Sequence, residues 1–255
     1  MQNIIFGTCF FVLGIIFGSF FNVVGLRIPN EQSIVLPRSH CPNCKKTLTG
    51  IELIPILSFL LQKGKCRNCH TKISVIYPFF ELLTGILFAF SFYYFGFTSE
   101  LIISLTLVSL LIIIVVSDYH YMIIPDKVLL FFAPVFIVER IFIPLHPWWN
   151  PLLGAAVGFG LLLLIAVISK GGMGGGDIKL FAVLGIVLGW KLVLFAFFMA
   201  TLFGAVFGVI GLTIKKVERG KPMPFGPYIA MGAIVSYFYG ETLINWYSSN
   251  FLTML

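Results

Sequence analysis

Charged residues are scarce in this sequence. They make up 11% of its 255 residues, and hydrophobic residues make up 59%, whereas about a quarter of an average soluble protein is charged. A soluble domain of this length could not bury so much apolar surface, so a soluble globular protein is excluded. The sequence also lacks low-complexity tracts and sustained heptads, which excludes a disordered chain and a coiled coil. A membrane protein with several spans remains.

The short motifs of several enzyme classes are absent as well. The sequence has no G-x-S-x-G and no H-E-x-x-H, so serine and zinc hydrolases lack support. It has neither a Walker pattern nor a glycine-rich Rossmann loop. The net charge of +7 is assigned to loops on one side of a membrane, and we expect no nucleic acid partner.

Apolar runs predict the fold class. We expect an all-α polytopic membrane protein with about eight transmembrane helices, and seven is the alternative because the sixth run is short and rich in glycine, with a turn near Gly189-Trp190. The first run is too long for a secretory signal, and no cleavage site follows it. The predicted spans cover residues 4–26, 78–96, 101–117, 127–145, 151–169, 178–190, 191–214 and 226–247.

Basic residues predict the orientation. If the stretch 27–75 lies in the cytoplasm and the chain has eight spans in total, 15 of the 17 Lys and Arg residues fall on that side, including Lys215–Lys221. This is the bias that the positive-inside rule describes. Both termini are then outside.

Two C-x-x-C pairs lie in the only long polar stretch. CPNC and CRNC supply Cys41, Cys44, Cys66 and Cys69, which is the ligand spacing of a structural zinc site with four cysteine ligands. A reducing cytoplasm favours metal over disulfides, although a redox dithiol pair and an empty site are alternatives, and His40 or His70 could replace a ligand. We therefore expect a small cytoplasmic zinc-binding domain at 27–77, after a first transmembrane helix at 1–26 and before a transmembrane bundle at 78–255.

The sequence has three aspartates, Asp118, Asp126 and Asp177, all at predicted ends of spans. Ionisable groups at membrane depth are costly and point to function, although an aspartate at a loop edge can be merely solvated. Asp177 follows GGMGGG, whose glycines allow close backbone approach to a substrate. Two adjacent carboxylates can share a proton, so that one activates water while the other polarises a peptide carbonyl.

These residues resemble those of type IV prepilin peptidases, the bifunctional leader peptidases and N-methyltransferases of the GxGD aspartic protease class. In the size of the chain and the form of its motifs, the sequence is similar to competence-type bacterial members of this family. The resemblance covers nearly the whole chain. It is carried by GSFFNVVGLRIP (18–29), RSHCPNCKKTL (38–48), GKCRNC (64–69), ISVIYPFFELLTG (73–85), SDYHYMIIPDKV (117–128), GGMGGGDIKL (171–180) and PFGPYIAMGA (224–233).

The resemblance implies roles for particular residues. Asp118, at the head of a D-x7-D segment, and Asp177, in GxGD, are the expected catalytic pair, with Gly174, Gly176 and Lys179 supporting the second. Asp126 is left out of this pair and is expected to be the N-cap of the helix that starts at Lys127.

The resemblance also implies substrates and cofactors. The substrates would be prepilins or pseudopilins with a short basic leader, cut at the cytoplasmic face of the bacterial plasma membrane. The new N-terminal residue, usually Phe, would be methylated with S-adenosylmethionine, an activity associated with the zinc-bearing stretch. The cofactor site and the oligomeric state are not predicted. Glu81, inside the second span, is a candidate polar contact for the cofactor or an ion-pair partner of Arg27 or Lys72.

Three other functions fit part of the sequence. One is a peptidase without methyltransferase activity. Another is a transporter, since acidic groups and a glycine-broken helix occur in transporters, although the two halves of this sequence show no matching interruptions. The third is a docking protein, although a docking role alone does not explain the glycine-rich stretch before Asp177.

Overall fold

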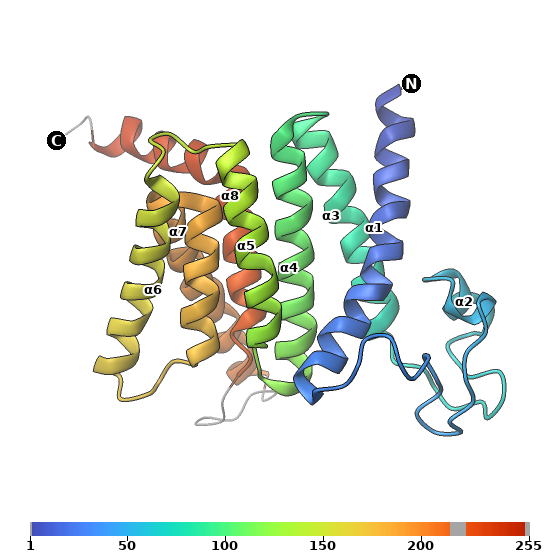
Figure 1. Ribbon diagram of the computed structural model, residues 1–255. Helices are drawn as coiled ribbons and strands as arrows, with labels where there is room; N and C mark the ends of the chain where they lie inside the picture. The colour runs from blue at the N-terminus through green and yellow to red at the C-terminus, as the bar shows by residue number, and fades with distance from the viewer. Residues whose placement is uncertain (1, 215–222, 253–255) are drawn as a thin grey trace. The chain divides into compact units, whose positions relative to one another are not determined.

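The computed structural model describes residues 2–214 and 223–252, and these residues are mostly helical (Figure 1). The basic loop Lys215–Lys221 lies outside the described residues. Contacts divide the chain into two compact units, Met1–Val116 and Ser117–Leu255. The only β-pairing in the described part consists of two isolated bridges in the cysteine-bearing stretch. The all-α fold class predicted from the sequence is confirmed.

The helices follow the predicted apolar runs to within a few residues. The short helix α2 and two 3₁₀ turns, Ile28–Asn30 and Ile51–Leu53, lie between the first two long helices. The helices are α1 (Gln2–Arg27), α2 (Leu57–Leu61), α3 (Ile76–Phe95), α4 (Ser99–Tyr121), α5 (Asp126–Phe142), α6 (Asn150–Ile168), α7 (Gly175–Thr213) and α8 (Gly226–Tyr247), which a short π-helical turn, Ser248–Leu252, follows.

Five helices of the described part are long and apolar enough to cross a membrane: α1, α3, α4, α6 and α7. Helix α7 has 39 residues and breaks at Gly189, whose φ of 76° and ψ of 174° are not helical. It therefore contains both of the spans predicted on either side of Gly189. The total of eight spans stays a prediction, because α5 and α8 do not meet the same criteria of length and composition.

Small residues bring α1 and α3 together in the first unit. A Cβ atom at Gly14 would lie 2.8 Å from the Cα atom of Gly85, and one at Gly18 would lie 2.9 Å from the Cα atom of Glu81. Glycines four residues apart on a membrane helix allow such backbone contact. This packing fixes the first turns of α3, which carry Glu81, against α1.

Glycines also allow α7 to pack closely in the second unit. Gly154 of α6 lies directly against Gly185 of α7, and a Cβ atom at Gly232 of α8 would lie 2.7 Å from the backbone nitrogen of Ala200. Helix α7 is therefore enclosed by backbone-close neighbours on two sides. This enclosure fixes the helix whose first turn carries Asp177.

Two polar side chains satisfy the backbone at the break in α7. Arg140, buried in α5, donates from Nε and Nη2 to the carbonyl oxygen of Val187 at 3.0 and 2.7 Å. Asn150 accepts from the backbone N–H of Trp190 through Oδ1 at 3.0 Å. Backbone groups freed by a helix break need such partners inside a membrane protein, so the break is a defined feature of the fold.

Candidate active site and metal centre

Two similar knuckles present the four cysteines. In the first, the N–H of Cys41 donates to the carbonyl of Lys46, and in the second the N–H of Cys66 donates to the carbonyl of Thr71. Each knuckle turns through a residue with positive φ, Lys45 at 57° and His70 at 54°. The bridges His40–Thr47 and Lys65–Lys72 close the two turns. The equivalent backbone patterns direct both pairs of thiols to one point.

The four sulfur atoms lie within 4.8 Å of one another. The Sγ atoms of Cys41 and Cys69 are 3.7 Å apart, and those of Cys44 and Cys66 are 4.0 Å apart. A tetrahedral zinc with Zn–S bonds of about 2.3 Å places its sulfurs about 3.8 Å apart, whereas a disulfide needs about 2.0 Å. The donor set therefore fits a metal ion such as zinc. His40 and His70 are outside this cluster.

Hydrogen bonds favour the metal-binding form of one cysteine. The hydroxyl of Thr71, 3.3 Å from the Sγ atom of Cys69, and its backbone N–H lower the pKa of Cys69 from 9.0 to about 5. Asn43 of the first knuckle donates to the same hydroxyl at 2.8 Å, so the two knuckles are joined by a bond that needs no metal. The thiolate is the form that binds metals.

Asp118 lies in the last turn of α4 and is buried. Its Oδ2 atom accepts a hydrogen bond of 2.6 Å from the backbone N–H of Gly226, the first residue of α8. A Cβ atom at position 226 would lie 2.8 Å from that oxygen. Glycine at 226 therefore allows the helix start to approach the carboxylate and to orient it.

Asp177 lies in the first turn of α7 and is half-buried. A Cβ atom at Gly174 would lie 3.0 Å from its Oδ2 atom, and one at Gly176 would lie 2.8 Å from the Cβ atom of Ile124, in the loop after Asp118. The charge of Asp177 interacts with that of Asp118. Asp118 and Asp177 therefore lie within the range of each other's charge, and glycines at 176 and 226 stand at close contacts with Ile124 and Asp118, where a Cβ atom would not fit.

Comparison with known proteins identifies the family. A model described as "Bacterial Peptidase A24 N-terminal domain" matches residues 12–95, and one described as "Type IV leader peptidase family" matches residues 105–209. The Prepilin leader peptidase/N-methyltransferase of Bacillus subtilis (strain 168) is 49% identical over 93% of this chain and 96% of its own length. This chain belongs to the type IV leader peptidase family.

Other relatives of the same name are more distant. The protein from Legionella pneumophila is 33% identical over 85% of this chain and 77% of its own length. The protein from Myxococcus xanthus (strain DK1622) is 39% identical over 82% of this chain and 64% of its own length. No solved structure matches this chain. The N-terminal family match contains all four cysteines, and the second match contains both Asp118 and Asp177.

Asp126 has a different role from the one expected. The prediction that it caps α5 is wrong, because α5 begins at Asp126 itself, Pro125 is the N-cap residue and no side chain bonds the cap. Instead the Oδ2 atom of Asp126 pairs with the Nζ atom of Lys179 at 2.6 Å, and both side chains are more than half exposed. Lys179 therefore links the starts of α5 and α7, and a pair as exposed as this one adds little stability.

Gly226 was not assigned a role from the sequence of this leader peptidase. The signal is Pro227, the second residue of α8, because proline is tolerated in the first turn of a helix, where backbone N–H groups have no partner within the helix. Such an N–H group can serve a carboxylate. The sequence could not show which carboxylate it serves, since Asp118 is 108 residues away along the chain.

Glu81 is buried in α3, and its Oε2 atom accepts a hydrogen bond of 2.7 Å from the backbone N–H of Ile56. The structure thus gives Glu81 a backbone partner in place of the expected Arg27 or Lys72. Ile56 has a φ of 58°, an unfavourable value for a β-branched residue. The Glu81 carboxylate therefore positions the segment that leads into α2.

Proposed function

We propose that this chain removes the leader from type IV prepilins or pseudopilins and methylates the new N-terminal residue, usually Phe. The relatives named Prepilin leader peptidase/N-methyltransferase match over most of the chain. The observation that supports the peptidase activity most directly is the pair of interacting carboxylates at Asp118 and Asp177, one of them oriented by Gly226.

In the proposed peptidase reaction, one carboxylate takes a proton from a water molecule, whose oxygen attacks the carbonyl carbon of the scissile peptide bond. The other, protonated, carboxyl group donates a hydrogen bond to the carbonyl oxygen. The first carboxyl group then transfers the proton that it took from water to the leaving nitrogen, and the C–N bond breaks. Because the N–H of Gly226 already bonds Oδ2 of Asp118, we assign the contact with water and substrate to its Oδ1 atom.

The four cysteines would hold one Zn²⁺ ion with a structural role. Four thiolate ligands leave no open coordination position for a substrate, so the ion would hold the two knuckles together. S-adenosylmethionine would supply the methyl group of the second activity. We assign no residue to its binding, since the carboxylate of Glu81, the candidate from the sequence, is engaged by Ile56.

The proposed organisation follows the sequence. A first transmembrane helix at 1–26 precedes a methyltransferase-associated zinc domain at 27–77 and a protease bundle at 78–255. The chain is a multi-pass membrane protein of the bacterial plasma membrane. The zinc domain and both aspartates are placed on the cytoplasmic side because that side would carry 15 of the 17 basic residues, which leaves both termini outside.

A cleavage and mass assay tests both activities. Purified protein in detergent is mixed with a prepilin peptide, with and without S-adenosylmethionine, and compared with Asp118→Asn and Asp177→Asn. The matched control is Asp126→Asn, which makes the same change at an exposed aspartate outside the pair. We expect wild type and the control to remove the leader, and the product to gain the mass of one methylene only with the cofactor.

Each part of the proposal can fail separately. Folded wild-type protein that leaves the peptide intact would contradict the peptidase and favour the transporter or docking alternatives. Leader removal by Asp118→Asn or by Asp177→Asn at the rate of the control would contradict the assignment of these two carboxylates to catalysis. Cleavage without methyl transfer would contradict the second activity and leave a peptidase alone.

A further inference from the structure

An exposed apolar segment lies between the two cysteine knuckles. Its exposed apolar side chains are Ile51 and Leu53 of the 3₁₀ turn, Ile54, and Leu57, Leu60 and Leu61 of α2. Leu57, Leu60 and Leu61 of α2 are 50, 65 and 64% exposed, and Ile51 is 60% exposed. A small soluble domain gains nothing from such a surface, and exposed apolar side chains gathered in one short segment indicate an interaction site.

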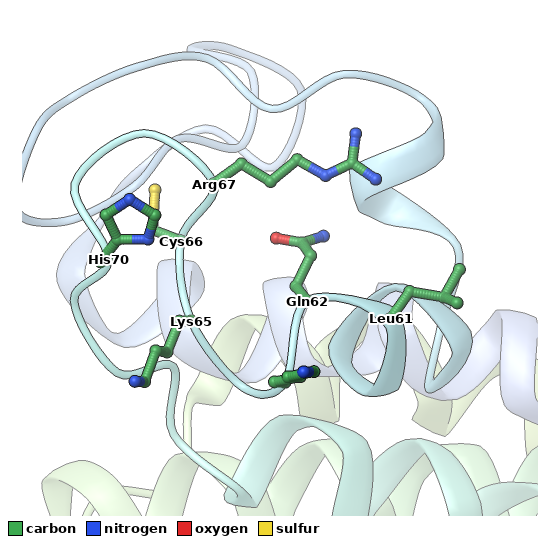
Figure 2. A pocket seen from close by; sticks show the side chains of 7 residues that line it. Leu61, Gln62, Lys65, Cys66, Arg67 and His70 are labelled. Carbon is green, nitrogen blue, oxygen red and sulfur yellow. The ribbon is translucent and has the colours of Figure 1, made fainter.

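Cations follow this apolar segment directly. Lys63, Lys65 and Arg67 are exposed, and together with Leu61 they line a pocket of about 320 Å³. Figure 2 shows Leu61 at one side of this pocket, with Arg67 and Gln62 reaching into it. Between Glu52 and Glu81 the sequence contains basic residues and no acidic residue. Both flanking carboxylates are engaged, Glu52 by Thr49 and Glu81 by Ile56.

Glu81 places this segment at the level of the membrane boundary. Helix α3 is a candidate membrane span that begins at Ile76, and Glu81 lies in its second turn, about 7 Å along the axis from the first residue. Because Ile56 bonds Glu81, the backbone that enters α2 lies beside the first turns of α3. The exposed leucines are therefore held where a bilayer passes from headgroups to acyl chains.

We propose that residues 51–67, the interfacial segment, dock on the phospholipid bilayer, with Leu57, Leu60 and Leu61 among the acyl chains and the pocket of Lys63, Lys65 and Arg67 on anionic headgroup phosphates. Apolar side chains beside a row of cations are the pattern of a chain that lies in the membrane interface. Each cation near an anionic bilayer surface adds to the attraction. Docking holds the cysteine domain against the membrane, independently of the reaction that the domain serves.

Photo-crosslinking tests the apolar part. The full-length protein carries the photoreactive residue p-benzoylphenylalanine in place of Leu60 and is reconstituted into phosphatidylglycerol vesicles. The matched control carries it in place of Thr47, an exposed residue of the first knuckle. We expect phospholipid adducts from position 60 in clear excess over position 47. Equal yields at both positions, or adducts from position 60 only to protein or to added prepilin peptide, would overturn the proposal.

Charge removal tests the headgroup pocket. For the protein with the photoreactive residue at position 60, replacing phosphatidylglycerol in the vesicles by phosphatidylcholine is expected to lower the yield of phospholipid adducts. The variant with Lys63→Gln, Lys65→Gln and Arg67→Gln should lose this preference, by roughly fivefold for each cation that contributes fully. The control with Lys45→Gln and Lys46→Gln in the first knuckle should keep it. A preference that survives the triple change, or that the control loses equally, would contradict the assigned pocket.

Discussion

At the scale of the residue, Gly226 offers a sharp test of the proposed dyad. Gly226→Ala places a Cβ atom 2.8–3.0 Å from Oδ2, Cγ and Cβ of Asp118, so the carboxylate must shift. A misplacement of about 1 Å can cost on the order of 10²-fold in rate. We expect kcat for leader cleavage to fall by that order with a smaller change in KM, measured with the prepilin peptide.

The control for this variant is Gly160→Ala in α6, because a Cβ atom at position 160 meets nothing within 4 Å. This change should leave kcat unaltered and, in a helix interior, should be neutral or slightly stabilising. Unimpaired cleavage by Gly226→Ala would show that the N–H of Gly226 and the orientation of Asp118 are not part of the mechanism.

Single residues also show the reach of sequence reasoning. Asp118 and Asp177 stand out from the sequence because each is a rare charge at the edge of an apolar run, and this signal is local. The partner of Asp126 gives no such local signal, because Lys179 is 53 residues away along the chain. Nothing in the sequence around Asp126 favours an ion pair over an N-cap. The bond from Ile56 to Glu81 is equally hidden, since a backbone N–H carries no sequence signature.

At the scale of the element, the break in α7 depends on α5. Arg140→Met removes both donors from the carbonyl of Val187 and leaves that buried group unsatisfied, which costs about 1–3 kcal/mol. We expect this loss in the free energy of unfolding, measured by titration with denaturing detergent in mixed micelles. Lys191→Met is the matched control, because it deletes an exposed charge beside the same break. Equal stability of the two variants would contradict the bracing role.

Helix positions were predictable because the apolar runs end where polar residues, glycine or proline begin. The two cysteine turns were predictable from spacing, since a C-x-x-C knuckle is a local structure. The break at Gly189 was predicted as a turn, but its stabilisation was not. Arg140 and Asn150 lie 47 and 40 residues from the backbone groups that they bond, and only the packed bundle brings them there.

At the scale of the whole molecule, the cysteines and the two aspartates belong to different compact units, Met1–Val116 and Ser117–Leu255. Metal removal should therefore separate the two proposed activities. Without its ion, a site of four cysteine ligands loses the bonds that join its knuckles, and the bond from Asn43 to Thr71 alone is worth about 1 kcal/mol. We expect trypsin to cut faster after Lys and Arg residues of 38–72, while leader cleavage continues.

The measurement uses Cys41→Ser and Cys66→Ser, which remove one ligand from each knuckle, and reads metal content, tryptic fragments, leader loss and methyl transfer from the same samples. Cys9→Ser is the matched control, because Cys9 lies in α1 outside the cluster. Both ligand variants should lose metal and methyl transfer, whereas cleavage stays close to that of the control, since Asp118, Asp177 and Gly226 keep every contact described for them. Cleavage lost in step with metal content would instead mean that the cysteine domain is needed for the peptidase reaction, and that the two compact units do not act independently.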